Sequence, residues 1–412
     1  MLIKDWKAVL TSSIYFIKLI FISKKYDVVF ATSNYFNKGQ NGKNLLLEPM
    51  IEFCKKNNLN FIIFENTDLK GEYQKFGRSN DSIPFDFMSL IQVILRKLYN
   101  LKYQKPVTEN DLYLREFEIS KILKKIFFRK FTSKVYITLI WNNVTLWRSI
   151  DSDSCVIDYQ HGIIFNGHLG YLIEGCPPKV KSENNICTLV HGSRFKKILI
   201  DSDKSKFYRE ENVINVGLKK ASNTQNIPSF NNKKILFSLQ IVPDFTDEVI
   251  YGYIYKLKKL LDFNAEFFSK HNYQIILKHH PRYTIQNCPE INFDYDFIKI
   301  NEEKSVAHLL NSVGLHMTFH STSAIDASMM GIPTVFIDTH ERFSPYEVFI
   351  NQYEYPLKNC LVKDSKDLQS ILLKFEDKET YSNSCKNIYS WSRKLSSNFN
   401  EDVFKNFILG KL

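Results

Sequence analysis

Short apolar segments alternate with longer amphipathic segments along most of the chain, and this alternation limits the possible fold more than any other feature. The candidate strands include residues 27–33, 59–65, 135–141, 155–162, 212–217, 234–240, 273–280, 315–319 and 333–338. Helical patterns separate these strands, as they do in βαβ units. Such units build parallel sheets that are covered by helices on both faces.

The series is interrupted once, by a segment rich in Asn, Ser and Lys at residues 218–233. This composition is typical of a linker, and a chain of 412 residues is too long for one ordinary core. We therefore predict an α/β protein with two Rossmann-like, doubly wound domains that face each other across a cleft. The predicted N-terminal domain spans residues 1–225, the C-terminal domain spans residues 226–390, and a last helix at 391–412 crosses back to the first domain.

The composition is that of a soluble globular protein, with 44% hydrophobic and 24% charged residues. The seven cysteines show no C-x-x-C spacing, so the sequence indicates neither a zinc site nor a disulfide framework. A reducing compartment fits this pattern, and we expect a cytoplasmic protein.

The positive charge is concentrated in the first third of the chain. Residues 1–150 hold 24 Lys and Arg against 13 Asp and Glu, whereas the remainder holds 31 of each kind. The densest segment, residues 121–134, has six basic and no acidic residues, with apolar residues at near-helical spacing. This pattern predicts a basic amphipathic helix, which either packs on the core or lies on anionic lipid. No nucleic-acid-binding motif accompanies the charge, so nucleic acid is not an expected partner.

The N-terminal segment is apolar but too short to span a bilayer. Its apolar part, residues 8–22, has 15 residues and is interrupted by Lys18, whereas a span needs about 20. We expect a helix packed on the first domain, in a protein that contacts the inner face of the membrane peripherally.

The first polar cluster follows the strand at 273–277. Lys278, His279, His280 and Arg282 occur together there, and Pro281 stiffens the loop. Cationic donors at the carboxyl end of a strand in an α/β sheet can bind a phosphate. The alternative is a structural histidine pair beside an exposed Lys and Arg, but four such groups in one cluster favour phosphate binding.

The second polar cluster follows the strand at 315–319. Ser321, Thr322 and Ser323 come where a helix begins, so their hydroxyls and the backbone amides there can bind an anion. Asp326 lies within the first turn of that helix, where its carboxylate could accept a hydrogen bond from a ribose or sugar hydroxyl. The alternative is a plain helix N-cap formed by the hydroxyl residues, with Asp326 favouring the helix dipole. We expect this cluster and the first one to form a nucleotide diphosphate site.

The third polar cluster lies in the first domain, at residues 157–171. Asp158, Gln160, His161 and His168 fall within this stretch, among glycines that permit tight turns. A histidine near its ordinary pKa can act as general base toward a hydroxyl. The alternative is a surface loop with one or two histidines of no special role.

Two other patterns carry little weight. "DSD" occurs at 151–153 and at 201–203, where it matches a short metal-binding pattern that arises readily by chance. The sequence contains neither G-x-G-x-x-G nor a P-loop, so it gives no motif support for a dinucleotide cofactor or an ATPase.

The segments "YQHGII", "GHLGY", "NVG", "LKHHP" and "STSAIDASMMGIP", in this order, resemble GT-B glycosyltransferases of bacterial capsule and O-antigen synthesis. The His-Pro pair and the Ser/Thr cluster are similar to the donor-phosphate motifs of sialyltransferase-like and Kdo-transferase-like enzymes. The resemblance covers about residues 155–338. It implies that His280, Pro281, Ser321 and Thr322 contact the donor phosphate. Sialyltransferases have an acidic residue before a glycine where this chain has His161 and Gly162, so either His161 or Asp158 would be the base.

These features together predict a metal-independent glycosyltransferase that has no cofactor and uses a nucleotide sugar as donor. Lys278, Arg282, Ser323 and Asp326 complete the expected donor site, while Gln160 and His168 lie on the acceptor side. The acceptor would be a lipid-linked or growing bacterial surface glycan. Three alternatives remain: a CDP-glycerol-type polyol-phosphate transferase, a sugar-nucleotide epimerase, and a non-catalytic partner in polysaccharide assembly.

Overall fold

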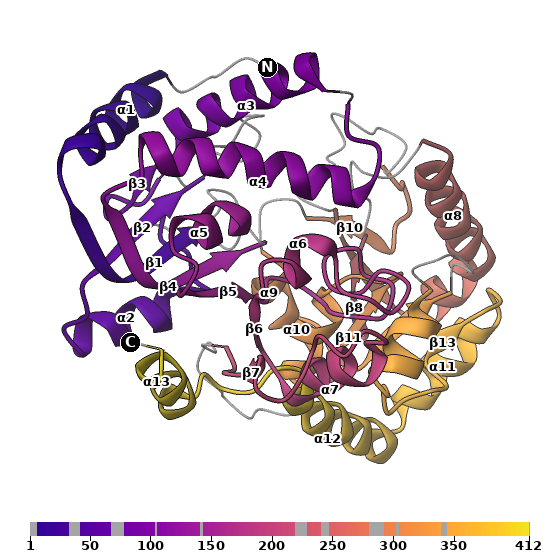
Figure 1. The fold of residues 1–412 in the computed structure, drawn as a ribbon. Coiled ribbons are helices and arrows are strands. Elements are labelled where there is room, and N and C mark those ends of the chain that lie inside the picture. Colours follow the sequence, from indigo (N-terminus) through magenta and orange to yellow (C-terminus); the bar gives the residue numbers. More distant parts are fainter. Residues whose placement is uncertain are drawn as a thin grey trace. The chain divides into compact units, whose positions relative to one another are not determined.

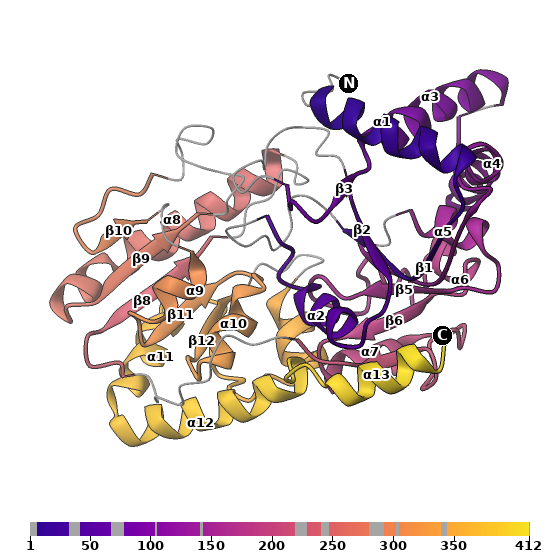
Figure 2. The same cartoon turned by 90° about the vertical axis from the view of Figure 1, so that its left-hand side faces the viewer.

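The computed structural model describes residues 6–32, 42–66, 78–103, 105–140, 143–218, 229–239, 247–279, 292–301, 305–338 and 344–411. The chain forms two compact units (Figures 1 and 2). Unit 1 comprises Met1–Ala221 and Ser397–Leu412, and unit 2 comprises Ser222–Ser396. The segment 219–228, which includes the predicted domain boundary, lies outside the described residues.

The described part of unit 1 contains a seven-stranded parallel sheet in the order β3-β2-β1-β4-β5-β6-β7. Its strands are β1 (Lys24–Thr32), β2 (Phe61–Glu65), β3 (Ile83–Pro84), β4 (Phe131–Leu139), β5 (Cys155–Tyr159), β6 (Cys187–Val190) and β7 (Val213–Asn215). Its helices are α1 (Trp6–Phe21), α2 (Glu48–Lys56), α3 (Asp86–Lys102), α4 (Glu109–Ile126), α5 (Val144–Ile150), α6 (Lys179–Ser182), α7 (Ser193–Ser202) and α13 (Glu401–Leu409).

The strands of unit 1 are apolar on both faces, because helices cover both sides of the sheet. On β1, Val29 and Ala31 join the core with α1, α3, α4 and α5, whereas Val28 and Phe30 join the core with α2 and α13. Trp147 of α5 anchors the first of these cores, where its ring stacks on neighbouring aromatic rings of the sheet. The period-two pattern of side chains thus explains why these short runs are strands.

The last residues of the chain complete unit 1. Phe404 of α13 packs edge-on against Phe53 of α2 with ring centroids 5.2 Å apart, and Lys56 pairs with Glu401 at 2.7 Å. Gly217 lies beside this returning segment with φ of +77°, and a Cβ there would come within 2.1 Å of the Asn398 carbonyl oxygen. Only glycine fits so close an approach.

The described part of unit 2 contains a six-stranded parallel sheet in the order β10-β9-β8-β11-β12-β13. Its strands are β8 (Lys234–Ser238), β9 (Gln274–Lys278), β10 (Ile298–Ile300), β11 (Leu315–Thr318), β12 (Thr334–Ile337) and β13 (Leu361–Val362). Its helices are α8 (Asp247–Lys270), α9 (Val306–Leu310), α10 (Ser323–Met329), the π-helix η3 (Tyr346–Gln352), α11 (Asp367–Glu376) and α12 (Lys378–Leu395).

Both sheets therefore have doubly wound topology, as the alternation of strands and helices predicts. When the strands of each unit are numbered from one in chain order, both sheets have the Rossmann order 3-2-1-4-5-6, and unit 1 has a seventh strand after the sixth. The direction of winding reverses between β1 and β4 in unit 1 and between β8 and β11 in unit 2. Ligands of such sheets bind outside the carboxyl ends of the strands, near this reversal.

One predicted element is wrong. Residues 121–134 do not form a single basic helix, because α4 ends at Ile126 and β4 begins at Phe131. From Phe131 onward the burial alternates, with Phe131, Ser133 and Val135 inside and the residues between them exposed. Residues from Phe131 onward form a strand because they pair with β1. The near-helical spacing of the residues before Phe131 led to the prediction of a helix. Within the described ranges, no helix has the length and apolarity that crossing a membrane requires.

Candidate active site

The carboxyl ends of three neighbouring strands in unit 2 carry polar residues in one row. Ser238 of β8 is in register with Lys278 of β9 on one side and with Thr318 of β11 on the other. Adjacent strands are about 4.8 Å apart, so the ends of β9 and β11 are about 10 Å apart. The two segments predicted to form the donor site therefore end at the same edge of one sheet. The strands that carry these two segments are not adjacent in the sheet, because β8 lies between β9 and β11.

His316 lies behind this row in the middle of β11 and organises a network of hydroxyls. Its Nε2 is 3.0 Å from Ser238 Oγ and 3.1 Å from Ser323 Oγ, and its Nδ1 is 3.1 Å from Thr334 Oγ1. Complete burial lowers the pKa of His316 to about 3. The ring is therefore neutral at physiological pH, and the network carries no formal charge.

The turn after β11 holds two of the predicted serines by local hydrogen bonds. The backbone N–H of Ser321 donates to Thr318 Oγ1 at 3.3 Å, and that of Ser323 donates to Ser321 Oγ at 3.3 Å. Ser321 and Ser323 are buried, whereas Thr322 between them is exposed at the start of α10. The arrangement presents the Thr322 side chain to solvent from a firmly held turn.

Two further titratable residues flank this turn. His320 is half-buried with its ring 5.7 Å from that of Tyr253 on α8, and burial lowers its pKa to about 4. Asp326 is exposed, yet the protein atoms around its carboxyl group desolvate the charged form and raise its pKa to about 6.

The first cluster is only partly within the described residues. Lys278 ends β9, its carbonyl accepts a hydrogen bond from the backbone N–H of Leu239 at 2.9 Å, and His279 after it is buried. His280, Pro281 and Arg282 lie outside the described residues.

In unit 1, Gln160 follows β5 and fixes the loop that carries His161. Its side chain is fully buried; Nε2 donates to the Gly162 carbonyl at 2.6 Å, and Oε1 accepts from the backbone N–H of His191 at 2.8 Å. These bonds join the end of β5 to the end of β6. Gln160 thus positions the loop, with both ends of its amide occupied.

The imidazoles of His161 and His168 both lie beside the Tyr171 ring. Ring centroids are 6.4 Å apart for His161 and Tyr171 and 5.3 Å apart for His168 and Tyr171. Burial lowers the pKa of His161, an effect that Asp158 opposes and Lys181 reinforces. The backbone N–H of Gly170 donates to His168 Nδ1 at 3.0 Å, and burial lowers the pKa of His168 to about 4. Both imidazoles are therefore neutral at physiological pH, and the Nδ1 lone pair of His168 is already occupied by the Gly170 N–H.

Asp158 is at the centre of a buried ion pair. Its Oδ2 is 2.6 Å from Lys181 Nζ, and both side chains are completely inaccessible to solvent. The ammonium group also lies 3.9 Å from the centroid of the Tyr171 ring. Desolvation lowers the pKa of Lys181, while the contact with Asp158 raises it. A carboxylate in this setting influences its surroundings electrostatically rather than by touching a substrate.

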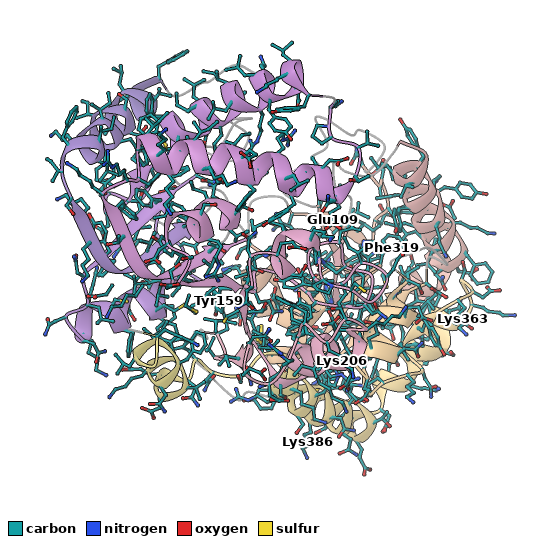
Figure 3. The ribbon with its side chains drawn as sticks, in the orientation of Figure 1. Glu109, Tyr159, Lys206, Phe319, Lys363 and Lys386 are labelled. Carbon is teal, nitrogen blue, oxygen red and sulfur yellow. The ribbon has the colours of Figure 1, made fainter. Side chains whose placement is uncertain are left out.

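Several of these residues were not predicted from the sequence. Lys181 and Tyr171 become part of the unit 1 cluster only through tertiary contacts. His191, at the end of β6, is buried against Tyr159 with a pKa lowered to about 3 by burial, and its Nε2 has no hydrogen-bond partner among the described residues. The repeated strand–His–Gly pattern at His161 and His191 was a usable signal for this last residue. Figure 3 labels Tyr159 at the end of β5 and Phe319 just after β11.

The described residues contain no cluster of three or more potential metal ligands. The two DSD segments make local turns instead: Asp151 Oδ1 accepts from the backbone N–H of Asp153 at 3.0 Å, and the Asp203 carboxylate accepts from those of Ser205 and Tyr208.

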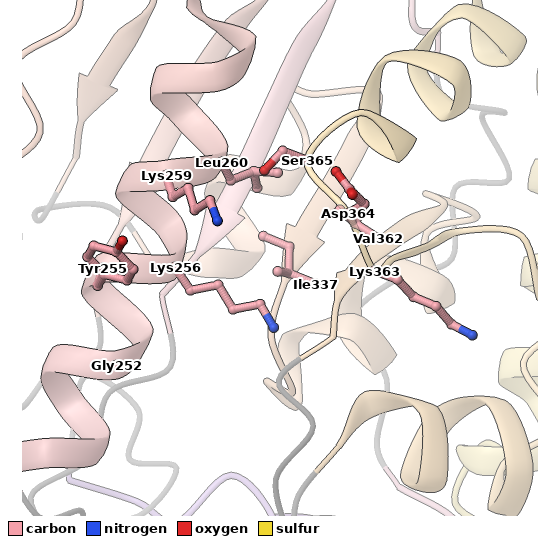
Figure 4. Close-up of a pocket in the computed structure, with 10 residues that line it drawn as sticks. All are labelled: Gly252, Tyr255, Lys256, Lys259, Leu260, Ile337, Val362, Lys363, Asp364 and Ser365. Carbon is pink, nitrogen blue, oxygen red and sulfur yellow. The ribbon is translucent and has the colours of Figure 1, made fainter.

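A pocket of about 410 Å³ lies in unit 2 between α8 and the ends of β12 and β13 (Figure 4). Lys256 and Lys259 extend into it from α8, opposite Ser365. The Lys256 ammonium donates to the carbonyl of Asp338 and so ties the helix to the end of β12. The residues that line this pocket belong to α8, β12, β13 and the segment 363–365, so the turn after β11 does not contribute to it.

No protein-family model matches the chain, and no curated protein is similar to it in sequence. Solved structures do resemble it. The calicheamicin glycosyltransferase CalG4 has a TM-score of 0.53 and 8% identity over 94% of this chain and 98% of its own. The glycosyltransferase SnogD from Streptomyces nogalater has a TM-score of 0.51 and 10% identity over 94% and 100%. The UDP-GlcNAc 2-epimerase of Methanocaldococcus jannaschii, in complex with UDP-GlcNAc and UDP, has a TM-score of 0.50 and 15% identity over 90% and 98%.

These likenesses extend over nearly the whole chain and show its fold. The protein has the GT-B fold, the class predicted from the sequence, which its structural neighbours use both for glycosyl transfer and for epimerisation of a nucleotide sugar.

Proposed function

We propose that this protein is a glycosyltransferase that moves a sugar from a nucleotide-activated donor to a lipid-linked or growing bacterial surface glycan. The observation that carries the proposal is the row formed by Lys278, Ser238 and Thr318 at the carboxyl edge of the unit 2 sheet. That edge includes the reversal of strand order, where nucleotide ligands bind in doubly wound sheets.

In the proposed donor site, unit 2 binds the nucleotide diphosphate. Lys278 supplies positive charge, and Thr322 supplies a hydroxyl donor from the turn that the bonds of Ser321 and Ser323 hold rigid. Both would stabilise the negative charge that develops on the departing phosphate. His280, Pro281 and Arg282 extend this site in the proposal, and Asp326 accepts from a ribose or sugar hydroxyl. No metal or cofactor takes part in the proposed reaction.

In the proposed acceptor site, His161 is the general base. Its imidazole is half-buried and neutral, so a ring nitrogen can take the proton of the acceptor hydroxyl as the oxygen attacks the anomeric carbon. The bond from that carbon to the donor phosphate breaks with its electron pair on the phosphate oxygen. His161 is favoured over Asp158 because Asp158 is inaccessible and paired with Lys181. His168 completes the acceptor side, and Gln160 positions the loop.

The donor site is tested by the thermal stability of the protein with CMP, CDP, UDP, GDP and dTDP. A nucleotide at 100 times its Kd raises the unfolding free energy by about 2.7 kcal/mol, so the base that binds is identified by its Tm shift. The Lys278→Ala, Thr322→Ala double variant should lose this shift. The control variant Ser370→Ala, which changes an exposed serine of α11, should keep the nucleotide-induced Tm shift. An unchanged shift in the double variant would overturn the assignment of the site.

The general base is tested by His161→Asn. This variant should keep the nucleotide-induced Tm shift but transfer sugar at least about 100-fold more slowly. Transfer at the normal rate would exclude His161 as the base.

A sugar-nucleotide epimerase is the second candidate, because the resemblance to the M. jannaschii epimerase extends over 90% of this chain. Incubation with UDP-GlcNAc alone separates the two. An epimerase converts the sugar without any acceptor, whereas a transferase releases its nucleotide only when an acceptor hydroxyl is supplied.

A further inference from the structure

Helix α1 of unit 1 is apolar on two opposite sides. One side, which includes Val9, Phe16 and Leu19, is buried against the core. The other side is exposed, with accessible fractions of 60% for Trp6, 64% for Leu10, 56% for Ile14, 47% for Ile17 and 71% for Phe21. A helix that is apolar all round is normally buried on all sides. The exposed side of α1 therefore requires an explanation of its own.

The exposed residues of α1 form one continuous stripe. They follow each other at intervals of four, four, three and four residues, which at 3.6 residues per turn confines them to an arc of about 80°. Isolated apolar side chains on a surface are ordinary, but a contiguous set of this kind is typical of an interaction surface.

The neighbouring helix α3 also exposes apolar side chains. Its exposed apolar side chains are Ile94, Leu98 and Leu101, the last of them 83% accessible. These three also recur at intervals of four and three residues and so share one side of the helix. Helices α1 and α3 pack against each other, and both views of unit 1 show them side by side (Figures 1 and 2).

The charges around this surface are positive. Lys7 and Lys18 on α1 and Lys97 and Lys102 on α3 are exposed, and α1 contains no acidic residue. The acidic residue of α3, Asp86, is buried and paired with Arg78 at 2.8 Å. A second copy of the chain would bring the same lysines together and be repelled. The surface is complementary to a partner that is apolar inside and negatively charged outside, which describes an anionic lipid bilayer.

We infer that the exposed sides of α1 and α3 are the surface by which this protein docks on anionic membranes. Trp6, Leu10 and Phe21 insert between lipid headgroups, and the lysines beside them contact the phosphates. The basic segment 121–134 is not this surface, because it is divided between α4 and β4. The inference goes beyond glycosyl transfer and is independent of it.

Binding of the full chain to vesicles tests the inference. Co-sedimentation should be strong with vesicles that contain phosphatidylglycerol, should weaken in high salt, and should be weak with pure phosphatidylcholine. The Leu10→Glu, Phe21→Glu double variant should bind at least about tenfold more weakly, because both charges would enter the headgroup region. Leu373→Glu, at an apolar position of α11 that is 45% exposed, should bind like the unaltered protein.

The emission of Trp6 supplies a second measurement at the surface itself. It should shift to shorter wavelength on vesicle binding, and the shift should disappear in Trp6→Phe. Equal vesicle binding by the double variant and the unaltered protein would overturn the inference, as would lipid-free dimerisation that Leu10→Glu abolishes. Circular dichroism shows whether the variants are folded. The nucleotide-induced Tm shift, measured without vesicles, reports the donor site separately, so failure of one proposal leaves the other testable.

Discussion

The polar strand ends of the two units are built in different ways. In unit 1 the end of β5 contains a buried ion pair: Asp158 and Lys181 are 2.6 Å apart, and both side chains are inaccessible to solvent. In unit 2 the polar groups near the end of β11 are neutral: the His316 ring is hydrogen-bonded to three hydroxyl groups. A buried ion pair fixes the local electric field but tolerates no loss of one partner. A neutral network leaves hydrogen-bonding capacity for a charged ligand. The first arrangement suits a proton acceptor and the second suits an anion.

Removing one partner of the buried ion pair should give the largest effect on stability. Lys181→Met leaves the Asp158 carboxylate buried without its countercharge and should lower the unfolding free energy by about 3–5 kcal/mol. Urea unfolding measures this change. Lys179→Met is the matched control on the same helix, because its exposed pair with Glu183 contributes less than about 1 kcal/mol.

A second variant determines whether charge or volume is responsible. The Lys181→Met, Asp158→Asn double variant should recover much of the lost stability, because no charge remains buried. If the double variant is no more stable than Lys181→Met, the ion pair is not what distinguishes unit 1.

Removing His316, the centre of the neutral network, should lower the unfolding free energy by less than Lys181→Met does. His316→Ala leaves buried hydroxyls of Ser238, Ser323 and Thr334 without this partner and should lower the unfolding free energy by about 2–3 kcal/mol. Urea unfolding again provides the measurement, with the exposed His308→Ala as control. If His316→Ala lowers the unfolding free energy as much as Lys181→Met does, the ion pair of unit 1 and the neutral network of unit 2 do not differ in their contribution to stability.

The pH dependence of stability compares one histidine from each unit. Burial lowers the pKa of His191 and of His316 to about 3, below the ordinary value of 6.5. Below pH 6.5 the unfolded chain therefore binds protons that the folded protein does not, and stability falls as the pH drops toward 4. Each histidine should contribute about 1.4 kcal/mol per pH unit in this window.

The variants His191→Gln and His316→Gln measure these two contributions. Each should flatten the dependence of the unfolding free energy on pH between 6 and 4.5, relative to the unaltered protein. An unchanged slope in both variants would mean that these rings are protonated in the folded protein.

The smallest effect on stability is expected at the tip of the unit 2 turn. Thr322 is exposed, and its side chain makes no capping hydrogen bond at the start of α10. Thr322→Ala should therefore change the unfolding free energy by less than about 0.5 kcal/mol while reducing the nucleotide-induced Tm shift. Ser323→Ala, which removes a buried hydroxyl bonded to His316, should instead lower stability by about 1 kcal/mol. Equal nucleotide shifts in Thr322→Ala and the unaltered protein would exclude this hydroxyl from the site.

The sequence was most informative where local patterns determine structure. The doubly wound sheets and the start of α10 followed from the apolar period and from helix signals, because these are set by residues close together in the chain. The segment 121–134 was misassigned because its apolar residues fit a helical period up to Ile126, and only pairing with β1 makes Phe131 part of a strand.

The candidate site was predictable in position but less so in its contacts. Strand ends were visible, so the placement of Lys278, His161 and the serines at or just after the ends of strands could be predicted from the chain alone. The partner of Asp158 could not, because Lys181 reaches it from a four-residue helix 23 positions later. The strand at 234–240 was predicted and is β8, but its place between β9 and β11 was not, because strand order in a sheet does not follow sequence order.

The contribution of α13 to unit 1 affects how the chain can fold during synthesis. The ribosome makes this helix only after all of unit 2, so Phe53 of α2 lacks its contact with Phe404 while residues 222–396 are being translated. Unit 2 can complete its own core in that interval, whereas unit 1 must wait for Phe404. The domain that begins first is therefore the one that finishes last, and it needs protection from aggregation for longer.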